Sequence, residues 1–259
     1  MPLAGIVLYI VYAAIVFPFR LLPEDAVEPV NDAIVAVVCS LGSYCFYRVS
    51  RLFDREDKAR MTWFLFAIGV GLDGLGHVVY SAGEFLIHGY APYPHPGDIF
   101  IIIGEGFNIS ALGYFYSHFK TSDLILTGGH KRAAQAIFFL YLLVVGIWII
   151  YPIVIDPEES IAMRISYLIY PCIDITFAYF GLFLSLSFIA MGAGPIVRPW
   201  LLLTAAYILF VFVDSLYAYL ESIEAYHPYL FINPGWALAY CLIAHAAYRQ
   251  KRLMSALQF

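Results

Sequence analysis

The stretch GVGLDGLGHVVYSAGE, residues 69–84, lies within a longer apolar run. Its polar side chains recur at steps of four, three and four residues, which places them on one face of a helix. The glycines in it indicate close packing against a neighbouring helix, because small residues let two backbones approach. The stretch therefore predicts a membrane-spanning helix whose polar face points toward other helices. The polar residues of this face are Asp73, His77, Tyr80 and Glu84.

The composition of the whole chain is that of an integral membrane protein. Hydrophobic residues make up 62% and charged residues 13% of the chain, and the mean hydropathy is +0.80, whereas soluble domains are about 45 to 50% apolar. A spanning helix needs about 20 mainly apolar residues. We therefore expect an all-α, multi-pass protein of the cell membrane, with lipids and no nucleic acid among its partners. The eight predicted spans are residues 3–19, 31–52, 61–86, 98–118, 133–155, 162–191, 199–224 and 234–249.

The basic residues predict the orientation of these spans. Lys and Arg collect on the cytoplasmic side of multi-pass proteins. Twelve of the 14 Lys and Arg residues fall on alternate loops or at the end of the chain, which leaves Arg20 and Arg164 on the other side. Both termini are therefore predicted to be cytoplasmic. The opposite loops are acidic, aromatic and rich in proline, and we expect them to be external.

A comparison of the chain with itself indicates an internal duplication. At a shift of about 137 residues several unusual positions coincide. The shift predicts, within one transmembrane domain, a first repeat of about 1–121 and a second of about 133–251. Four spans in each make this a parallel 4+4 repeat, and such halves tend to share a site between them. Chance agreement between aromatic-rich segments is the alternative. The aligned pairs include Trp63 with Trp200, Tyr80 with Tyr217, and Glu84 with Glu221.

Polar residues inside the other spans extend the face that begins at Asp73. Counting along each helix at about 1.5 Å per residue places most of them in the middle and outer part of the bilayer. We therefore expect an outward-open, acidic and aromatic-lined cavity, with the Tyr and Glu pairs of the two repeats at its entrance. Asp98, in the turn-like stretch PHPGD, is expected to cap a helix. The predicted ligand- or cation-binding residues are Asp73, His77, Tyr80, Glu84, Glu105, Asn108, Asp174, Asp214, Tyr217 and Glu221.

The acids of this set lack basic partners. A charged side chain at the bilayer centre costs at least about 2.5 kcal/mol on the insertion scale. No Lys or Arg falls at the depth of Asp73, Glu105, Asp174 or Asp214. These carboxyl groups must share protons, contact water, or hold a cation such as a metal ion or an organic amine. A structural role is the alternative, in which protonated acids join helices through hydrogen bonds.

The residue types also bear on two specific possibilities, a retinal protein and a metal-dependent enzyme. A retinal protein needs a lysine inside a span, and every lysine falls in a predicted cytoplasmic segment, so no retinal is expected. A metal-dependent enzyme needs a compact set of His and carboxylate ligands with one open position. No H-E-x-x-H motif is present, and binding is favoured over catalysis, so no catalytic residue is assigned. The metal-ligand candidates are Asp73, His77, Glu105 and Asp214.

Several short motifs resemble a known family. They are Y-x-x-x-E before a Pro-rich loop, P-G-D at the start of the next span, YPCID at 170–174, VDSLYAYLE at 213–221 and PGWALAY at 234–240. Together they resemble the polytopic sensory modules at the N-termini of prokaryotic diguanylate cyclases and sensor histidine kinases. The resemblance implies a sensor or receptor-like role with an unidentified ligand. Because no output domain follows the last span in RQKRLMSALQF, sensing would need a separate cytoplasmic signalling partner.

The sequence thus leaves three functions open. The first is a receptor or sensor that binds a small ligand or cation in the outward-facing cavity. The second is a proton- or cation-coupled transporter that uses the same acids. The third is a metal-dependent membrane enzyme.

Overall fold

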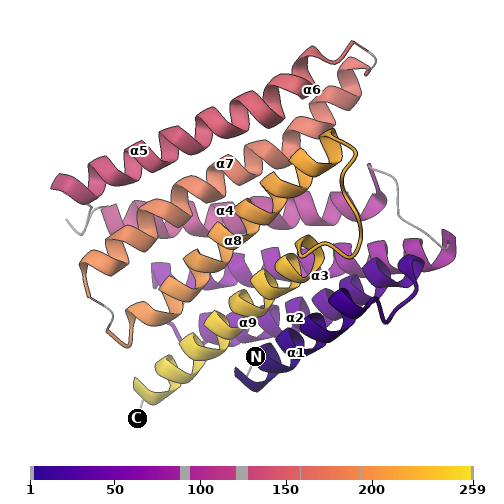
Figure 1. Cartoon of the computed structure of the whole chain (residues 1–259). Coiled ribbons are helices and arrows are strands. Elements are labelled where there is room, and N and C mark those ends of the chain that lie inside the picture. Colours follow the sequence, from indigo (N-terminus) through magenta and orange to yellow (C-terminus); the bar gives the residue numbers. More distant parts are fainter. Residues whose placement is uncertain (1–2, 88–93, 121–127, 158, 193, 258–259) are drawn as a thin grey trace.

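The computed structural model describes residues 3–87, 94–120, 128–157, 159–192 and 194–257, and all regular structure in these ranges is helical (Figure 1). A π-helical turn, η1, joins α5 to α6 without a break. The elements are α1 (Leu3–Phe19), α2 (Glu24–Ser50), α3 (Lys58–Ile87), α4 (Pro96–Lys120), α5 (Gly128–Val145), η1 (Gly146–Ile150), α6 (Tyr151–Ile155), α7 (Ile161–Ala190), α8 (Val197–Ser222) and α9 (Ile232–Leu257).

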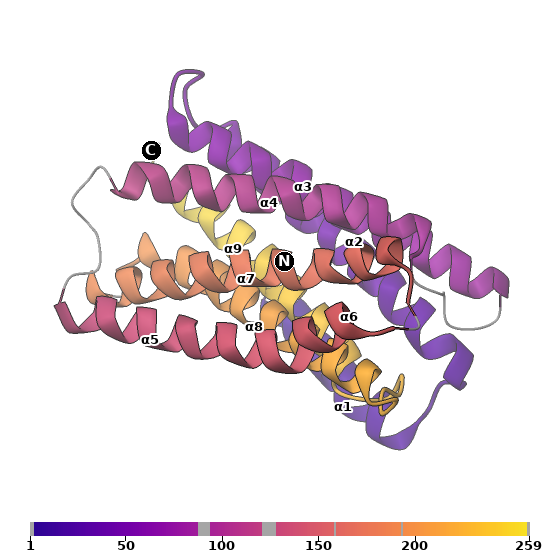
Figure 2. The ribbon, with the colours of Figure 1, turned by 90° about the horizontal axis from the view of Figure 1, so that it is seen from above.

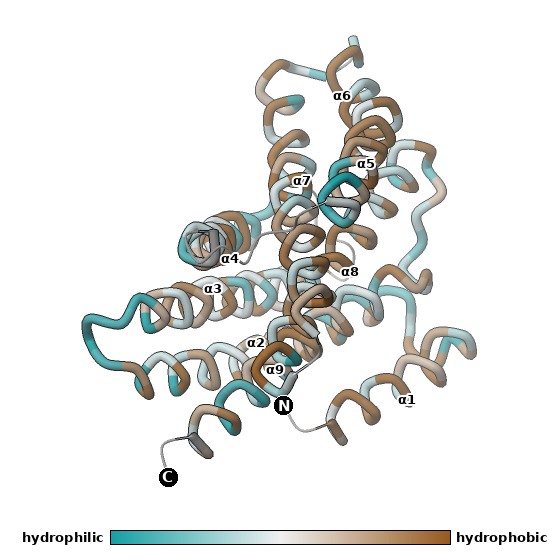
Figure 3. Tube along the Cα trace, turned by 90° about the vertical axis from the view of Figure 1, so that its left-hand side faces the viewer, coloured by the Kyte–Doolittle hydropathy of each residue, from teal (hydrophilic) through white to brown (hydrophobic). Residues whose placement is uncertain are grey.

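Each of the eight predicted spans coincides with one helix when α5, η1 and α6 are taken together. In the described part of the chain, six of these are long and apolar enough to cross a membrane, and α1 is a shorter apolar helix. Figure 3 shows hydrophobic residues along most of α1, α5, α7 and α8. The long helix α9 is less hydropathic because it packs between α2 and α8. Its side chains therefore contact protein, and they do not need to be as apolar as lipid-facing ones.

Two helices, α2 and α9, extend past the limits expected from hydropathy, and α9 continues to Leu257. α2 begins at Glu24, whereas the predicted span begins at residue 31. Glu24 and Asp25 occupy its first turn, where negative charge is favourable to the helix dipole. α7 continues through Pro171 over its full length.

Six of the helices form a closed ring. Its order is α2, α3, α4, α7, α8 and α9, and α9 packs back onto α2. α1 packs on α9 and α5 packs on α7, so both lie outside the ring. Figure 2 shows α4 between α3 and α7, with α5 beside α7 and α8. The ring encloses the side chains that line the inner faces of α3 and α8.

The crossing of α3 and α4 is built on glycines. Gly69 and Gly76 on α3 meet Gly104 and Gly97 on α4. A methyl group at position 104 would lie 2.8 Å from the carbonyl oxygen of Gly69, and one at position 76 would lie 2.9 Å from that of Gly97. The two backbones approach so closely that even a methyl group does not fit. The close packing predicted from the glycines around Asp73 is therefore confirmed.

One end of the ring is filled by a layer of aromatic rings, which we call the aromatic plug. The centroids of Trp63 and Trp200 are 4.4 Å apart, and those of Phe115 and Trp200 are 3.8 Å apart and stacked. The plug lies at the end where α3 and α8 begin, next to Arg51 and Arg55 of loop 51–57 and next to Arg198. It consists of Phe46, Trp63, Phe66, Phe115, Phe188 and Trp200.

Candidate functional site

Asp73 lies in the middle of α3, with 1% of its surface exposed. The amide of Asn108 on α4 donates to Asp73 Oδ2 at 2.9 Å. Asp73 Oδ1 fills the space beside the missing side chain of Gly104, and Asn108 Oδ1 fills the space beside Gly69. The glycine crossing therefore makes room for a polar pair between the two helices. Neither Asp73 Oδ1 nor Asn108 Oδ1 has a hydrogen-bond partner among the described residues.

Three further carboxyl groups lie beside this pair, on α4, α7 and α8. Glu105 lies near both Asp73 and Asp214. Asp174 lies next to Asp214, with their carboxyl groups within hydrogen-bonding reach. The indole Nε1 of Trp236 donates to Asp214 Oδ1 at 2.5 Å. We call this set the acid cluster: Asp73 on α3, Glu105 on α4, Asp174 on α7 and Asp214 on α8.

The acid cluster carries no basic counterpart of its own. No Lys or Arg of the described chain forms an ion pair with any of its four members; both recorded pairs in that part join a histidine to another acid. The imidazole of His77 lies near Asp214. Its Nδ1 is 3.0 Å from Asp32 Oδ1, so this ring is already engaged by an acid outside the cluster. The charge imbalance predicted from the sequence is present in the fold.

Tyrosine rings border the acid cluster. Tyr207 lies near Asp73 and Glu105, and its hydroxyl is buried without a hydrogen-bond partner among the described residues. Tyr240 lies near the same two acids and near Asp214, and its ring meets that of His77 edge-on at 5.2 Å. The cluster thus combines excess carboxylate with aromatic faces and unsatisfied oxygens.

Three of the four acids of the cluster are buried, whereas the sequence predicts a cavity open to the exterior. Asp73, Glu105 and Asp174 are 1%, 5% and 4% exposed. Asp214 is half-buried, beneath the indole of Trp236. Counting residues along a helix estimates depth, but it cannot show which side chains of neighbouring helices cover a group. Side chains of neighbouring helices therefore cover three of the four acids, and an opening toward the exterior stays a prediction.

The residues expected at the entrance occupy different surroundings. Glu84 is 2% exposed, and so is buried, whereas Glu221 is exposed in the last turn of α8. Tyr217 packs edge-on against Tyr226 and Trp236. Tyr80 points to Asp98. Tyr217 and Glu221 lie within hydrogen-bonding reach of each other, and a common entrance formed by all four residues stays a prediction.

Asp98 is the main residue that the candidate set omitted. Its Oδ2 accepts the backbone N–H of His95 at 2.6 Å, which is the reciprocal half of a helix capping box. Its Oδ1 also accepts the hydroxyls of Tyr80 on α3 and Tyr170 on α7, at 2.6 and 2.5 Å. The expected cap is present, and the same carboxyl group joins three helices. The available sequence signals were Tyr80, the PGD stretch that contains Asp98, and YPCID, which begins with Tyr170.

The Asp98 contacts make a testable prediction. Asp98→Ala is expected to lower the free energy of unfolding by about 3 kcal/mol, because hydrogen bonds to charged groups contribute about 1.5 to 3 kcal/mol each. Thermal unfolding in detergent measures the loss. The matched control is Asp57→Ala, since Asp57 only accepts the N–H of Ala59 at an exposed helix start and should cost about 1 kcal/mol. Equal losses in the two variants would show that the tyrosine contacts contribute nothing.

A second polar network joins α1, α2 and α9 on the other side of the ring. Tyr226 donates to Glu28 Oε1 at 2.5 Å, and Asn31 donates to the backbone oxygen of Asn233 at 3.1 Å. Tyr9 completes it by donating to Asn31 Oδ1 at 2.9 Å. Sequence reasoning missed it because Glu28 and Asn31 were read as loop or span-edge residues. Its donors and acceptors satisfy one another, which is the pattern of a structural network.

The metal-ligand candidates do not assemble. In residues 3–87, 94–120, 128–157, 159–192 and 194–257, no group of three or more His, Cys, Asp or Glu side chains has an arrangement suited to a metal ion. Asp73, His77, Glu105 and Asp214 therefore lack the compact geometry that a catalytic zinc site requires.

The chain matches no protein-family model, and no curated protein or solved structure is significantly similar to it. Function must accordingly be argued from the site itself.

Proposed function

We propose that this chain is a receptor-like, multi-pass membrane protein that binds a small organic cation in the acid cluster. The observation that carries the proposal is the convergence of four carboxyl groups from α3, α4, α7 and α8 with no Lys or Arg paired to them in the described chain. Buried acids without a counter-charge in a membrane protein usually mark a functional site. A cation from outside would supply the missing charge.

The surroundings of the cluster favour an ammonium group over a metal ion. The described residues offer no three-ligand metal geometry, whereas Tyr207 and Tyr240 border the acids with their rings. A cation close to an aromatic face gains about 0.5 to 2 kcal/mol, most when water is excluded. Asp73 Oδ1, Asn108 Oδ1 and the Tyr207 hydroxyl are the buried oxygens available to N–H donors.

The aromatic plug favours binding over transport. A transporter needs a polar route to each side in turn, and the plug closes one end of the ring with stacked rings. The transporter alternative requires these rings to separate. Cation uptake into proteoliposomes that disappears in Asp73→Asn would support that alternative.

The order of helices in the ring supports the proposed duplication. Around the ring, α7, α8 and α9 of the second half are neighbours in the same order as α2, α3 and α4 of the first half. Trp63 and Trp200, which the internal comparison aligns, contact each other across the ring. We infer a pseudo-two-fold axis near these tryptophans, with the acid cluster between the halves. The loops beside the plug would then be cytoplasmic, as would both termini.

The proposed role agrees with the resemblance to prokaryotic sensory modules. On this interpretation a ligand held between the halves changes how they pack, and the basic end of the bundle contacts a separate cytoplasmic signalling partner.

A thermal-shift experiment tests the proposal. A panel of primary and quaternary alkylamines is added to the detergent-purified protein, and we expect at least one to raise the melting temperature. At a ligand concentration of 100 times Kd the stabilisation is about 2.7 kcal/mol. The Asp73→Asn, Asp214→Asn double variant should lose this shift, because it removes two of the four negative groups.

The control variant is Glu221→Gln, which removes an exposed acid from the end of α8 and should keep the shift. If no amine stabilises the wild type more than the double variant, the acid cluster is structural and the proposal is wrong.

A further inference from the structure

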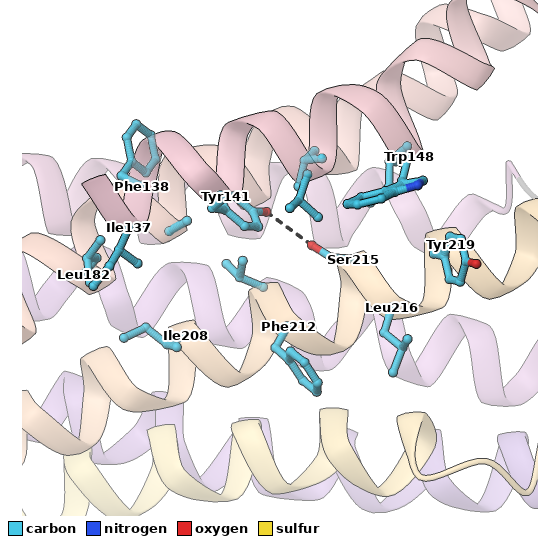
Figure 4. A pocket seen from close by; sticks show the side chains of 15 residues that line it. Ile137, Phe138, Tyr141, Trp148, Leu182, Ile208, Phe212, Ser215, Leu216 and Tyr219 are labelled. Carbon is cyan, nitrogen blue, oxygen red and sulfur yellow. Dashed lines mark hydrogen bonds between the residues drawn. The ribbon is translucent and has the colours of Figure 1, made fainter. Parts of the chain in front are cut away.

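The structure has a cavity of about 650 Å³ outside the ring, between α5, α7 and α8. In Figure 4, Ile137 and Tyr141 of α5 and Trp148 of η1 point down toward α8, with Leu182 of α7 at one end. None of the four acids of the cluster lines this cavity, although Tyr141 on its wall lies near Asp174 and Asp214. Its volume is within the range of about 300 to 1,000 Å³ that holds small-molecule ligands.

The lining determines what the cavity can hold. No charged side chain lines it, and most of its walls are aliphatic or aromatic. Tyr141 Oη and Ser215 Oγ face each other from α5 and α8, 3.3 Å apart, so they can hydrogen-bond to each other and need no ligand (Figure 4). An uncharged hydrocarbon therefore fits these walls, whereas a charged or strongly polar ligand would be left without partners.

The position of the cavity indicates the source of that hydrocarbon. Along α8 it extends from Ile208 to Tyr219, roughly 16 Å at about 1.5 Å per residue. This is about half of the 30 Å hydrocarbon core of a bilayer, or the depth of one leaflet. Neighbouring side chains of α5, including Leu140 and Leu143, are large, apolar and exposed, so this flank of the bundle faces lipid.

Local structure distinguishes the two ends of the cavity. Trp148, in the π-helical turn, and Tyr219, near the end of α8, lie at one end, and Ile137 and Leu182 at the other (Figure 4). Tyr and Trp prefer the interface between hydrocarbon and headgroups. π-helical turns occur frequently at functional sites, and this one supplies Trp148 and Ile149 to the wall.

We infer that this cavity binds one acyl chain of a membrane phospholipid, with the glycerol end beside Trp148 and Tyr219 and the methyl end beside Ile137 and Leu182. The inference is independent of the acid cluster. A second copy of the chain is the weaker occupant: a helix about 10 Å wide would fill 650 Å³ with only about 8 Å of its length, or about five residues.

Native mass spectrometry of the full chain, released from mild detergent, tests this inference. We expect one phospholipid to remain bound to the wild type. Ala178→Trp should lower the bound fraction at least about tenfold, because Ala178 lines the cavity and the indole would fill it. Leu216→Trp is a second filling variant at another wall position, and thermal unfolding establishes that each variant is folded.

The matched control is Leu140→Trp, which adds the same ring on the lipid-facing side of α5, outside the cavity. It should retain the phospholipid. A wild type without bound lipid, a retained mass equal to a free fatty acid, a lipid-free dimer, or equal retention in Ala178→Trp and Leu140→Trp would each overturn the inference.

Discussion

Replacing Gly104 with leucine is expected to lower the free energy of unfolding by about 4 kcal/mol, or to prevent accumulation of the folded protein. Any Cβ at this position would collide with Asp73 Oδ1 and would lie 2.8 Å from the Gly69 carbonyl oxygen. The backbone oxygen cannot move without separating α3 from α4. Overpacking costs about 1 to 3 kcal/mol, and loss of the Asn108–Asp73 hydrogen bond leaves a buried group unpaired at a further 1 to 3 kcal/mol or so.

The control lies two residues further along the same helix. No atom lies within 4 Å of where a Cβ at Gly106 would be, so Gly106→Leu should be neutral or slightly stabilising, because glycine is a poor helix former. Thermal unfolding in detergent, together with size-exclusion chromatography, compares the two variants. Similar melting temperatures for them would mean that the α3–α4 crossing is looser than described.

Trp200→Ala is expected to cost about 3 to 5 kcal/mol, the usual range for removal of a large buried aromatic side chain. The Trp200 ring contacts Trp63 at 4.4 Å, Phe115 at 3.8 Å and Phe188 at 6.0 Å between centroids. Its removal leaves a void at the centre of the aromatic plug, where α3, α4, α7 and α8 meet. Trp148→Ala is the control, because Trp148 is 53% exposed and should cost less than half as much.

Trp200→Ala also distinguishes whether the aromatic plug is a static core or a gate. If the plug is a static core, Trp200→Ala changes stability alone. If the plug is a gate, the variant should also make proteoliposomes leak the cation that binds the acid cluster. A stability loss equal to that of Trp148→Ala would show that the plug is not a packed layer.

The helices could be predicted from the sequence because length and hydropathy decide them locally. Each predicted span coincides with a helix, since a segment of about 20 apolar residues in a bilayer must satisfy its own backbone hydrogen bonds. The ends were less predictable. Acidic residues such as Glu24 and Asp25 look like loop by hydropathy but extend α2 by favourable placement in its first turn.

The candidate site could be predicted only in part. The step of three or four residues put Asp73 and His77 on one face, and the absence of Lys and Arg marked the charge imbalance. What covers a side chain depends on other helices. Asp98 illustrates this dependence: capping was expected, but its contacts with Tyr80 and Tyr170 bring together residues 18 and 72 positions away.

The sequence by itself determined that this protein is a bundle of apolar helices with acids inside and no basic partners, because composition and periodicity are properties of single segments. Only the tertiary structure decided that four of those acids share one largely buried cluster, that glycines at an α3–α4 crossing hold Asp73 there, and that α5 leaves an apolar cavity against α7 and α8. Closure, close approach and voids arise between helices, and their positions depend on how side chains from distant parts of the chain pack together.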